Sequence, residues 1–455
     1  MLAKNNHLQL LIDDFGASGE GVGRANGFTL FVEGGVPGDL LEVRVLKLKK
    51  QYGYGKIVRV INASPLRTEP VCSIFGRCGG CNLQHVKYEA QLAYKKSKIE
   101  NCLKKIGGFT KAAVEEIISA EEPFFYRNKG LFPVGFVNGK AVAGLFAARS
   151  HRVIPCEKCY IQHPINDEIL KIICDFLNEK KISVYDESTH TGIIRHIMTR
   201  VAPHTQEVMV CLVINSQTLP HAQELVARLT KIKQITSIML NINTEKTNVA
   251  LGTESKLLWG NSTIMGELCS LKFEISPSSF LQVNTRQTEK LYKLVADMAL
   301  SENKNPTVLD IYCGIGTISL YMARRGANYV VGVESVTQAI EDAKRNALIN
   351  KIKNVEFFAG KAEEVIPKLY HQQGFKVDVV VLDPPRKGCD EAVLKSILKI
   401  QPKRIIYVSC DPATLARDLK QLCVDGYALK RIVGVDCFCM TPHIETVCSL
   451  EFSQN

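Results

Sequence analysis

The chain has 455 residues, of which 46% are hydrophobic and 23% are charged, and its formal net charge is +11 with an isoelectric point near 8.8. This length exceeds that of one ordinary hydrophobic core, so we expect two or three domains, and the composition excludes an intrinsically disordered protein. The excess of Lys and Arg favours a polyanionic partner such as RNA, with a generally basic enzyme as the alternative.

The N-terminal stretch 1–16 has no pattern of a signal peptide. It contains Asp13 and Asp14 and lacks the order of basic, apolar and small residues. No apolar run approaches the ~20 residues that cross a bilayer. We therefore expect a cytoplasmic protein without membrane association, and we also expect a monomer. Its 16 cysteines are then mostly free thiols, and a close cluster of them is a metal or catalytic candidate.

Residues 1–63 predict a small β-barrel, because short strand-like segments alternate there with Gly and Pro. The predicted strands are 16–23, 28–32, 34–38, 41–46 and 56–60. Segment 47–56 interleaves lysines with Tyr52 and Tyr54, as proteins that bind single-stranded RNA do. A solvated hairpin tip is the alternative interpretation.

Residues 64–272 predict a strand-rich α+β central domain. A Lys-rich helix is expected at 88–106, packed on the following domain. Before this helix lie three closely spaced cysteines, and two more follow later in the domain: Cys72, Cys78 and Cys81, then Cys156 and Cys159. The spacing alone allows a tetrahedral zinc site formed by the two C-x₂-C pairs, which would leave Cys72 unused.

Residues 273–455 alternate helices with short apolar strands, which predicts a doubly wound parallel sheet. The first strand ends in Asp310 and runs into a turn with Gly314 and Gly316. The next strand ends in Glu334, 24 positions after Asp310, where a carboxylate can hold ribose hydroxyls. Together these residues indicate an adenosyl cofactor, whereas an ordinary βαβ turn with a solvated Glu is the alternative.

A later strand ends in Asp383, followed by Pro384, Pro385 and Arg386. Many methyltransferases keep substrate-facing residues at this position. Enzymes that methylate an exocyclic nitrogen usually have an aromatic residue after the two prolines. Arg386 therefore disfavours that chemistry.

The fourth strand runs up to Cys410, and Asp411 and Pro412 predict the N-cap and first residue of a helix. The helix N-terminus should favour a thiolate. Taken alone, Cys410 is more typical of a packing cysteine. However, Asp310, Glu334 and Asp383 end strands at the same expected edge, which favours a nucleophile.

A thiolate at this edge suits methylation of a pyrimidine carbon. C5 of uracil becomes nucleophilic only after a group adds to C6, and a base must later remove the C5 proton. His443 and Glu445, before a final alternating strand, are candidate bases, although either could be a surface residue.

These residues resemble the 5-methyluridine RNA methyltransferase family, specifically its iron–sulfur branch that modifies 23S ribosomal RNA. The resemblance covers nearly the whole chain and is carried by segments 36–39, 78–81, 279–284, 310–316, 382–388, 409–415 and 443–445. Two positions depart from the pattern: Asp411 stands where Asn is more usual, and Thr317 where some relatives have Asn.

The resemblance implies an OB-like TRAM barrel, a central domain and a Rossmann-like methyltransferase domain that uses S-adenosylmethionine. It implies that Cys410 is the nucleophile, that Glu445 is the base, and that Phe280 lies near the target base. By resemblance, the cofactor or the adjoining uracil contacts Gln282, Tyr312, Glu334 and Asp383. A [4Fe–4S] cluster is implied on Cys72, Cys78, Cys81 and Cys159. The related transfer-RNA enzyme and a non-catalytic RNA-binding iron–sulfur protein are the alternatives.

Overall fold

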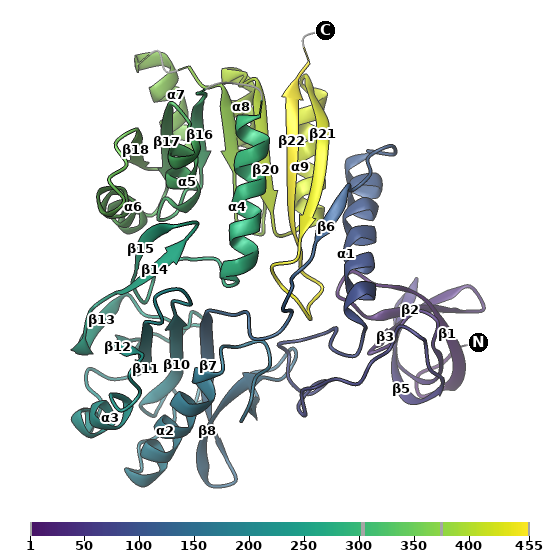
Figure 1. The fold of residues 1–455 in the computed structure, drawn as a ribbon. Coiled ribbons are helices and arrows are strands. Elements are labelled where there is room, and N and C mark those ends of the chain that lie inside the picture. Colours follow the sequence, from purple (N-terminus) through teal and green to yellow (C-terminus); the bar gives the residue numbers. More distant parts are fainter. Residues whose placement is uncertain (1, 302–304, 374–375, 454–455) are drawn as a thin grey trace.

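The computed structural model describes residues 2–301, 305–373 and 376–453. Within these ranges the chain forms a closed barrel, a seven-stranded sheet, a two-stranded hairpin and an eight-stranded sheet. Figure 1 shows the eight-stranded sheet above the seven-stranded one, with the barrel to the side, next to the lower end of α1. No helix in the described ranges is long and apolar enough to cross a membrane.

The N-terminal barrel is closed in the order β1-β2-β3-β5-β4. Its strands are β1 (His7–Phe15), β2 (Gly21–Ala25), β3 (Phe28–Glu33), β4 (Leu40–Leu48) and β5 (Tyr52–Asn62). Alternate side chains of β1, β3 and β4 fill the interior, as a period of two requires. The strand predicted at 34–38 is wrong. Gly34 and Gly38 have φ of 79° and 92°, so this segment is a turn.

The central sheet has the order β13-β12-β11-β10-β7-β8-β9. Its strands are β7 (Lys129–Val137), β8 (Lys140–Phe146), β9 (Val153–Pro155), β10 (Ile194–Val201), β11 (Val208–Ile214), β12 (Ile235–Ile242) and β13 (Glu254–Gly260). Two helices, α2 (Ile165–Glu179) and α3 (Ala222–Leu229), bury their apolar faces against it. The hairpin of β14 (Ile264–Leu268) and β15 (Leu271–Ile275) follows.

The eight-stranded sheet has the order β18-β17-β16-β19-β20-β22-β21-β6. Its strands are β16 (Thr307–Ile311), β17 (Tyr329–Glu334), β18 (Val355–Ala359), β19 (Val379–Leu382), β20 (Arg404–Ser409), β21 (Tyr427–Val435), β22 (Glu445–Phe452) and β6 (Glu116–Ile118). The helices of this region are α4 (Thr285–Leu300), α5 (Thr317–Arg325), α6 (Thr337–Ile349), α7 (Ala362–Gln373), α8 (Glu391–Ile400) and α9 (Pro412–Val424). The sheet is parallel from β18 to β20, as expected, whereas β22 runs antiparallel to both of its neighbours.

Helix α1 (Tyr88–Cys102), extended by a π-helical turn at Leu103–Gly107, joins the barrel side of the molecule to the eight-stranded sheet. Ile99 and Leu103 are fully buried in the same core as α9. Strand β6 then adds to the edge of the eight-stranded sheet beside β21. Residues 88–118 thus precede the central sheet in sequence but pack with the eight-stranded sheet (Figure 1).

Candidate active site

Cys410 and Glu445 are brought together by the antiparallel pairing of β20 and β22. The last pair of this ladder is Ser409 with Thr446, so the register places Cys410 opposite Glu445. Side chains directly opposite each other on antiparallel strands have Cβ atoms about 5 Å apart and point to the same face. Cys410 is half-buried and Glu445 is buried. The expected nucleophile and the expected base are therefore cross-strand neighbours.

The surroundings of Cys410 raise the pKa of its thiol. Burial raises its pKa to about 11, the charge of Glu445 adds to this increase, and Arg386 opposes it. Asp411 caps α9 as expected, accepting hydrogen bonds from the backbone N–H of Ala413 at 2.8 Å and Thr414 at 3.3 Å. The expected helix N-terminus lies beside Cys410, but desolvation and nearby carboxylates raise the pKa of the thiol, which is opposite to the shift toward a thiolate that the sequence predicted.

The environment of Glu445 raises the pKa of its carboxylate, so that this group accepts a proton more readily than an exposed Glu. Burial raises its pKa, and the neighbouring Asp383 raises it further. Its Oε2 atom is buried and has no hydrogen-bond partner among the described residues. A buried carboxylate oxygen without a partner is costly, so a proton or a ligand is favoured at this position.

Asp383 and Gln282 lie in contact beside these two residues. Gln282 is buried and Asp383 is half-buried, and the amide of Gln282 donates to the carboxylate of Asp383. Burial raises the pKa of Asp383, and the hydrogen bond from Gln282 opposes that increase. Phe280, expected near the target base, is 69% exposed in the same connection before α4. An exposed aromatic ring at this edge is available for stacking on a base.

Glu334 lies at the carboxyl end of β17, as expected, and its carboxylate is fixed in place. It accepts hydrogen bonds from Gly314 N at 3.3 Å, Val336 N at 2.9 Å and Ser335 Oγ at 3.0 Å. Gly314 has φ of 54°, and a Cβ placed there would meet no atom within 4 Å. The backbone between β16 and α5 is therefore open to a ligand on this side.

Asp310 and Tyr312 border the same turn. The hydroxyl of Ser319 donates to Asp310 at 2.5 Å, while Asp310 Oδ1 is buried without a partner among the described residues. Burial raises the pKa of Asp310 to about 7. Tyr312 has φ of 69°, a left-handed backbone conformation that is uncommon for a residue other than glycine. An open backbone, a fixed carboxylate and an orphaned carboxylate oxygen fit an adenosyl cofactor.

A cleft of about 940 Å³ lies between the barrel and the end of β20. The eight-stranded sheet region contributes Cys410, Pro412 and His443, and α1 with its π-helical turn and the barrel contribute the opposite walls. The basic and aromatic residues of these walls are Lys98, Lys105, Tyr94, Arg24, Phe15 and Phe31. Burial lowers the pKa of His443 to about 4, so the imidazole is neutral near pH 7. The helix predicted at 88–106 was expected to pack on the domain of residues 273–455, but the sequence did not predict that residues of this helix line the cleft.

Three aromatic rings of the barrel form a cluster next to the cleft. The ring centroid of Phe31 lies 5.6 Å from that of Tyr52 and 6.1 Å from that of Tyr54, and the two tyrosines are 5.7 Å apart. Tyr52 is exposed. Phe31 also lines the cleft, so the cluster that contains Tyr52 and Tyr54 borders it through Phe31.

The five cysteines expected near a metal line one small pocket. The backbone N–H of Gly80 lies 3.3 Å from Cys78 Sγ, and the amide of Gln84 lies 3.3 Å from Cys81 Sγ. In the described residues, no three His, Cys, Asp or Glu side chains converge on a point that could hold a single metal ion. Among these same described residues, the geometry shows neither the expected [4Fe–4S] cluster nor the alternative zinc site on the two C-x₂-C pairs.

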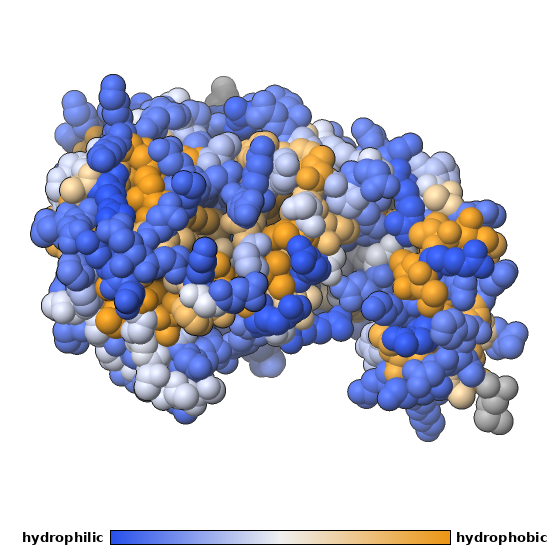
Figure 2. Space-filling model, turned by 90° about the horizontal axis from the view of Figure 1, so that it is seen from below, coloured by the Kyte–Doolittle hydropathy of each residue, from blue (hydrophilic) through white to orange (hydrophobic). Residues whose placement is uncertain are grey.

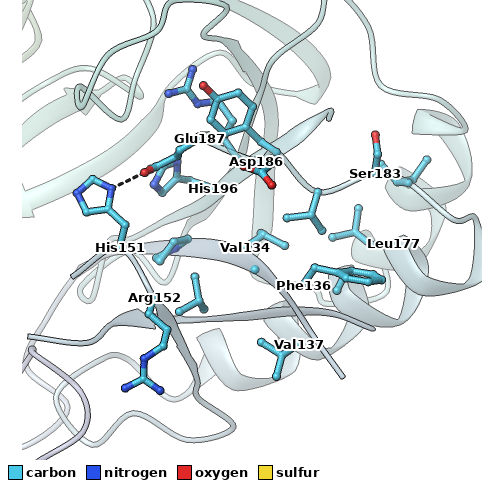
Figure 3. Close-up of a pocket in the computed structure, with 18 of the residues that line it drawn as sticks. Val134, Phe136, Val137, His151, Arg152, Leu177, Ser183, Asp186, Glu187 and His196 are labelled. Carbon is cyan, nitrogen blue, oxygen red and sulfur yellow. Dashed lines mark hydrogen bonds and ion pairs between the residues drawn. The ribbon is translucent and has the colours of Figure 1, made fainter. Parts of the chain in front are cut away.

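A further cavity of about 920 Å³ lies in the central domain, near the end of α2. Figure 3 shows the apolar residues Val134, Phe136 and Leu177 along one part of it and the pair of His151 and Glu187 at the other. His151 Nδ1 lies 2.5 Å from Glu187 Oε2. None of the expected site residues lines this cavity.

Comparison with known proteins finds one family match for the N-terminal barrel and another for most of the remaining chain. Residues 87–452 match the family model of tRNA (uracil-5-)-methyltransferases, and residues 5–58 match the TRAM domain. Uncharacterized RNA methyltransferases of Halalkalibacterium halodurans and Clostridium acetobutylicum are 45% and 46% identical, each over 98% of this chain and 97% and 96% of their own. The solved Pyrococcus abyssi tRNA (uracil-54, C5)-methyltransferase with S-adenosyl-L-homocysteine is 31% identical, with a TM-score of 0.79 over 97% of this chain and 99% of its own.

Proposed function

This chain belongs to the tRNA (uracil-5-)-methyltransferase family and carries a TRAM domain, and on this premise we propose that it methylates C5 of a specific uridine in RNA through a covalent adduct with Cys410. The coarser statement, an RNA methyltransferase that depends on S-adenosylmethionine, follows from the family and from its relatives. The placement of Cys410 opposite Glu445 carries the finer proposal.

The reaction begins at Cys410. Its thiolate adds to C6 of the uracil, a C6–S bond forms, and the electron pair of the C5–C6 double bond moves toward C5 as an enolate. Arg386 is the resident cation that lowers the pKa of the thiol, and in our proposal it supports the thiolate. S-adenosylmethionine supplies the electrophilic methyl group that the enolate carbon takes.

Glu445 completes the reaction in our proposal. Its carboxylate removes the proton from C5, the C5–C6 double bond forms again, and the bond between C6 and Cys410 Sγ breaks, which returns the thiolate. The unpartnered Oε2 atom is the acceptor we assign to this proton. Methyl donor, nucleophile and base are thus each used once per turnover.

We assign the cofactor contacts to Tyr312, Glu334, Gln282 and Asp383. Glu334 holds the ribose hydroxyls, because it ends β17 beside the open turn at Gly314. Gln282 and Asp383 lie closest to Glu445 among these residues and are assigned to the side that faces the uracil.

We assign a [4Fe–4S] cluster to Cys72, Cys78, Cys81 and Cys159. Support comes from the shared pocket and from the N–H groups aimed at Cys78 and Cys81, since hydrogen bonds to the sulfurs are typical of iron–sulfur sites. Such a cluster would cross-link the segments before α1 with the segment after β9. No step of the methylation uses it.

We propose 23S ribosomal RNA as the substrate of a monomeric, cytoplasmic enzyme, on the strength of the cysteine pocket and the sequence resemblance to the iron–sulfur branch. Transfer RNA is the second candidate, because the family model and the P. abyssi protein bear its name. Incubation with labelled S-adenosylmethionine and unmodified transcripts of both RNAs separates them. 5-Methyluridine in 23S RNA alone supports the first, and in transfer RNA alone the second.

A further inference from the structure

The connection between β21 and β22, residues 436–444, contains a buried ion pair that the proposed chemistry does not use. Lys95 Nζ of α1 lies 2.6 Å from Asp436 Oδ1, and both side chains are 0% exposed. A buried ion pair contributes little net stability, because desolvation of the two charges offsets their attraction. A role in fixing one geometry explains such a pair better than stabilisation does.

Asp436 follows directly on the residue that pairs with Glu445. Val435 and Glu445 form the last pair of the ladder between β21 and β22, and they close the connection at its base. The backbone of Asp436 is held from the other side by the amide of Gln287, at 3.3 Å from its carbonyl oxygen. A shift of Asp436 would therefore be transmitted through Val435 to Glu445.

One face of α1 is devoted to this connection. Four polar residues of α1, spaced three or four positions apart, form hydrogen bonds with every second residue of the connection between 436 and 442. The contacts are Tyr88 Oη to Asp436 Oδ2 at 2.9 Å, Gln91 Oε1 to Met440 N at 3.2 Å, Lys95 Nζ to Phe438 O at 3.1 Å and Lys98 Nζ to Pro442 O at 2.8 Å. Residues three and four apart lie on the same side of a helix. The regular match shows a built contact rather than a chance one.

The opposite side of the connection rests on the cysteine pocket. Cys439 and Met440 belong to the same buried cluster as Cys78 and Cys81. Tyr126 donates to the carbonyl oxygen of Cys439 at 3.1 Å. The connection is thus clamped between α1 and this pocket.

We propose that Lys95 is a positioning residue for the methylation reaction, which through Asp436 keeps Glu445 opposite Cys410. The inference rests on the proposed function, because it needs Glu445 as the base. The addition of Cys410 and the methyl transfer do not require Glu445. A displaced Glu445 therefore slows only the last step, in which the C5 proton moves to its carboxylate and the C6–S bond breaks.

The test is the accumulation of this last intermediate. The double variant Lys95→Met/Asp436→Asn removes both charges, so that neither remains buried alone. We expect that 5-methyluridine forms about tenfold to a hundredfold more slowly, as a small misplacement of a catalytic group predicts. We also expect that a denaturant-stable adduct of protein and methylated RNA builds up in a single turnover. The KM for RNA and the Kd for S-adenosylmethionine should stay at the wild-type values.

The exposed pair of Lys171 and Asp175, at 80% and 67% exposure, provides the matched control. Lys171→Met/Asp175→Asn should resolve the adduct at the wild-type rate. Tyr88→Phe removes one hydrogen bond to Asp436 and leaves both charges, so it should accumulate the same adduct to a smaller extent. If the double variant is poorly folded, the Tyr88→Phe variant alone tests the positioning role.

An adduct that is resolved at the wild-type rate in Tyr88→Phe, or in a double variant that still binds S-adenosylmethionine, would overturn the positioning role. Absence of methyl transfer by the wild-type protein would instead overturn the proposed function, and the inference with it.

Discussion

Cys410 and Glu445 face each other across the end of the ladder between β20 and β22, one position beyond the pair of Ser409 and Thr446. The parallel strands of the sheet bring only their carboxyl ends to this edge. Because β22 is antiparallel, it brings its first residue to the same edge. The final antiparallel strand is thus what places a base next to a nucleophile that ends a parallel strand.

The environment of Glu445 predicts that the rate of methylation decreases at mildly acidic pH. Burial and Asp383 raise its pKa above the ordinary value of about 4.3, so the base is lost by protonation at a higher pH than usual. Cys410 has a raised pKa as well, so the rate should increase with pH through neutrality. The measurement is the pH profile of single-turnover methylation.

Asp383→Asn supplies the matched variant for this profile. It removes the second cause of the raised pKa of Glu445, so the acidic limb should move to lower pH even where the maximal rate is reduced. A limb that stays in place would show that Glu445 does not set it.

Glu334→Gln is expected to weaken S-adenosylmethionine binding about tenfold to a hundredfold, because charge-assisted hydrogen bonds contribute about 1.5–3 kcal/mol. Isothermal titration gives the Kd directly. Glu341→Gln, an exposed carboxylate on α6, is the control and should bind like the wild type. Equal Kd values for Glu334→Gln and Glu341→Gln would remove Glu334 from the cofactor site.

The metal and sulfide content of the purified protein tests which metal group the cysteine pocket binds. Anaerobically purified protein should hold about four iron and four inorganic sulfide per chain. Ser in place of Cys72, Cys78, Cys81 or Cys159 should lower the iron content strongly, and Cys156→Ser should retain it. Zinc that is lost on Cys156→Ser but retained on Cys72→Ser would favour the site on the two C-x₂-C pairs.

The aromatic cluster of the barrel should contribute to RNA affinity. Tyr52→Ala and Tyr54→Ala are each expected to weaken RNA binding by about 1–3 kcal/mol, as the loss of one stacked base predicts. The Kd is measured at one fixed salt concentration, because phosphate contacts make it salt-dependent. Phe136→Ala removes an exposed ring from the cavity of Figure 3 and is the control. A larger loss in Phe136→Ala than in the tyrosine variants would move the RNA path to the central domain.

The sequence predicts the strand ends well, because a buried parallel strand is visible in the sequence as an apolar run that stops at a polar residue. Glu334, Asp383 and Cys410 all lie where such runs end. Asp411 and Pro412 likewise mark the start of α9, since capping is local chemistry.

Long-range pairing could not be predicted in the same way. The sequence predicts a Lys-rich helix at 88–106 that packs on the following domain, but it does not predict that Gln91 and Lys95 are fully buried, because the 436–444 connection that covers them is distant in sequence. The pKa of Cys410 also depends on Glu445 and Arg386, which lie far from it in sequence. On the face seen from below in Figure 2, hydrophobic side chains gather in patches between hydrophilic ones, and this grouping depends on the folded structure.

The central claim is that Cys410 forms a covalent bond to the target uridine and that Glu445 allows its release. The most direct measurement is mass spectrometry of the denatured Glu445→Gln variant after one turnover with RNA and S-adenosylmethionine. We predict a peptide containing Cys410 that carries a methylated uridine, and no such peptide from Cys410→Ala. An unmodified Cys410 in a variant that has bound both substrates, or 5-methyluridine made by Cys410→Ala, would contradict the account.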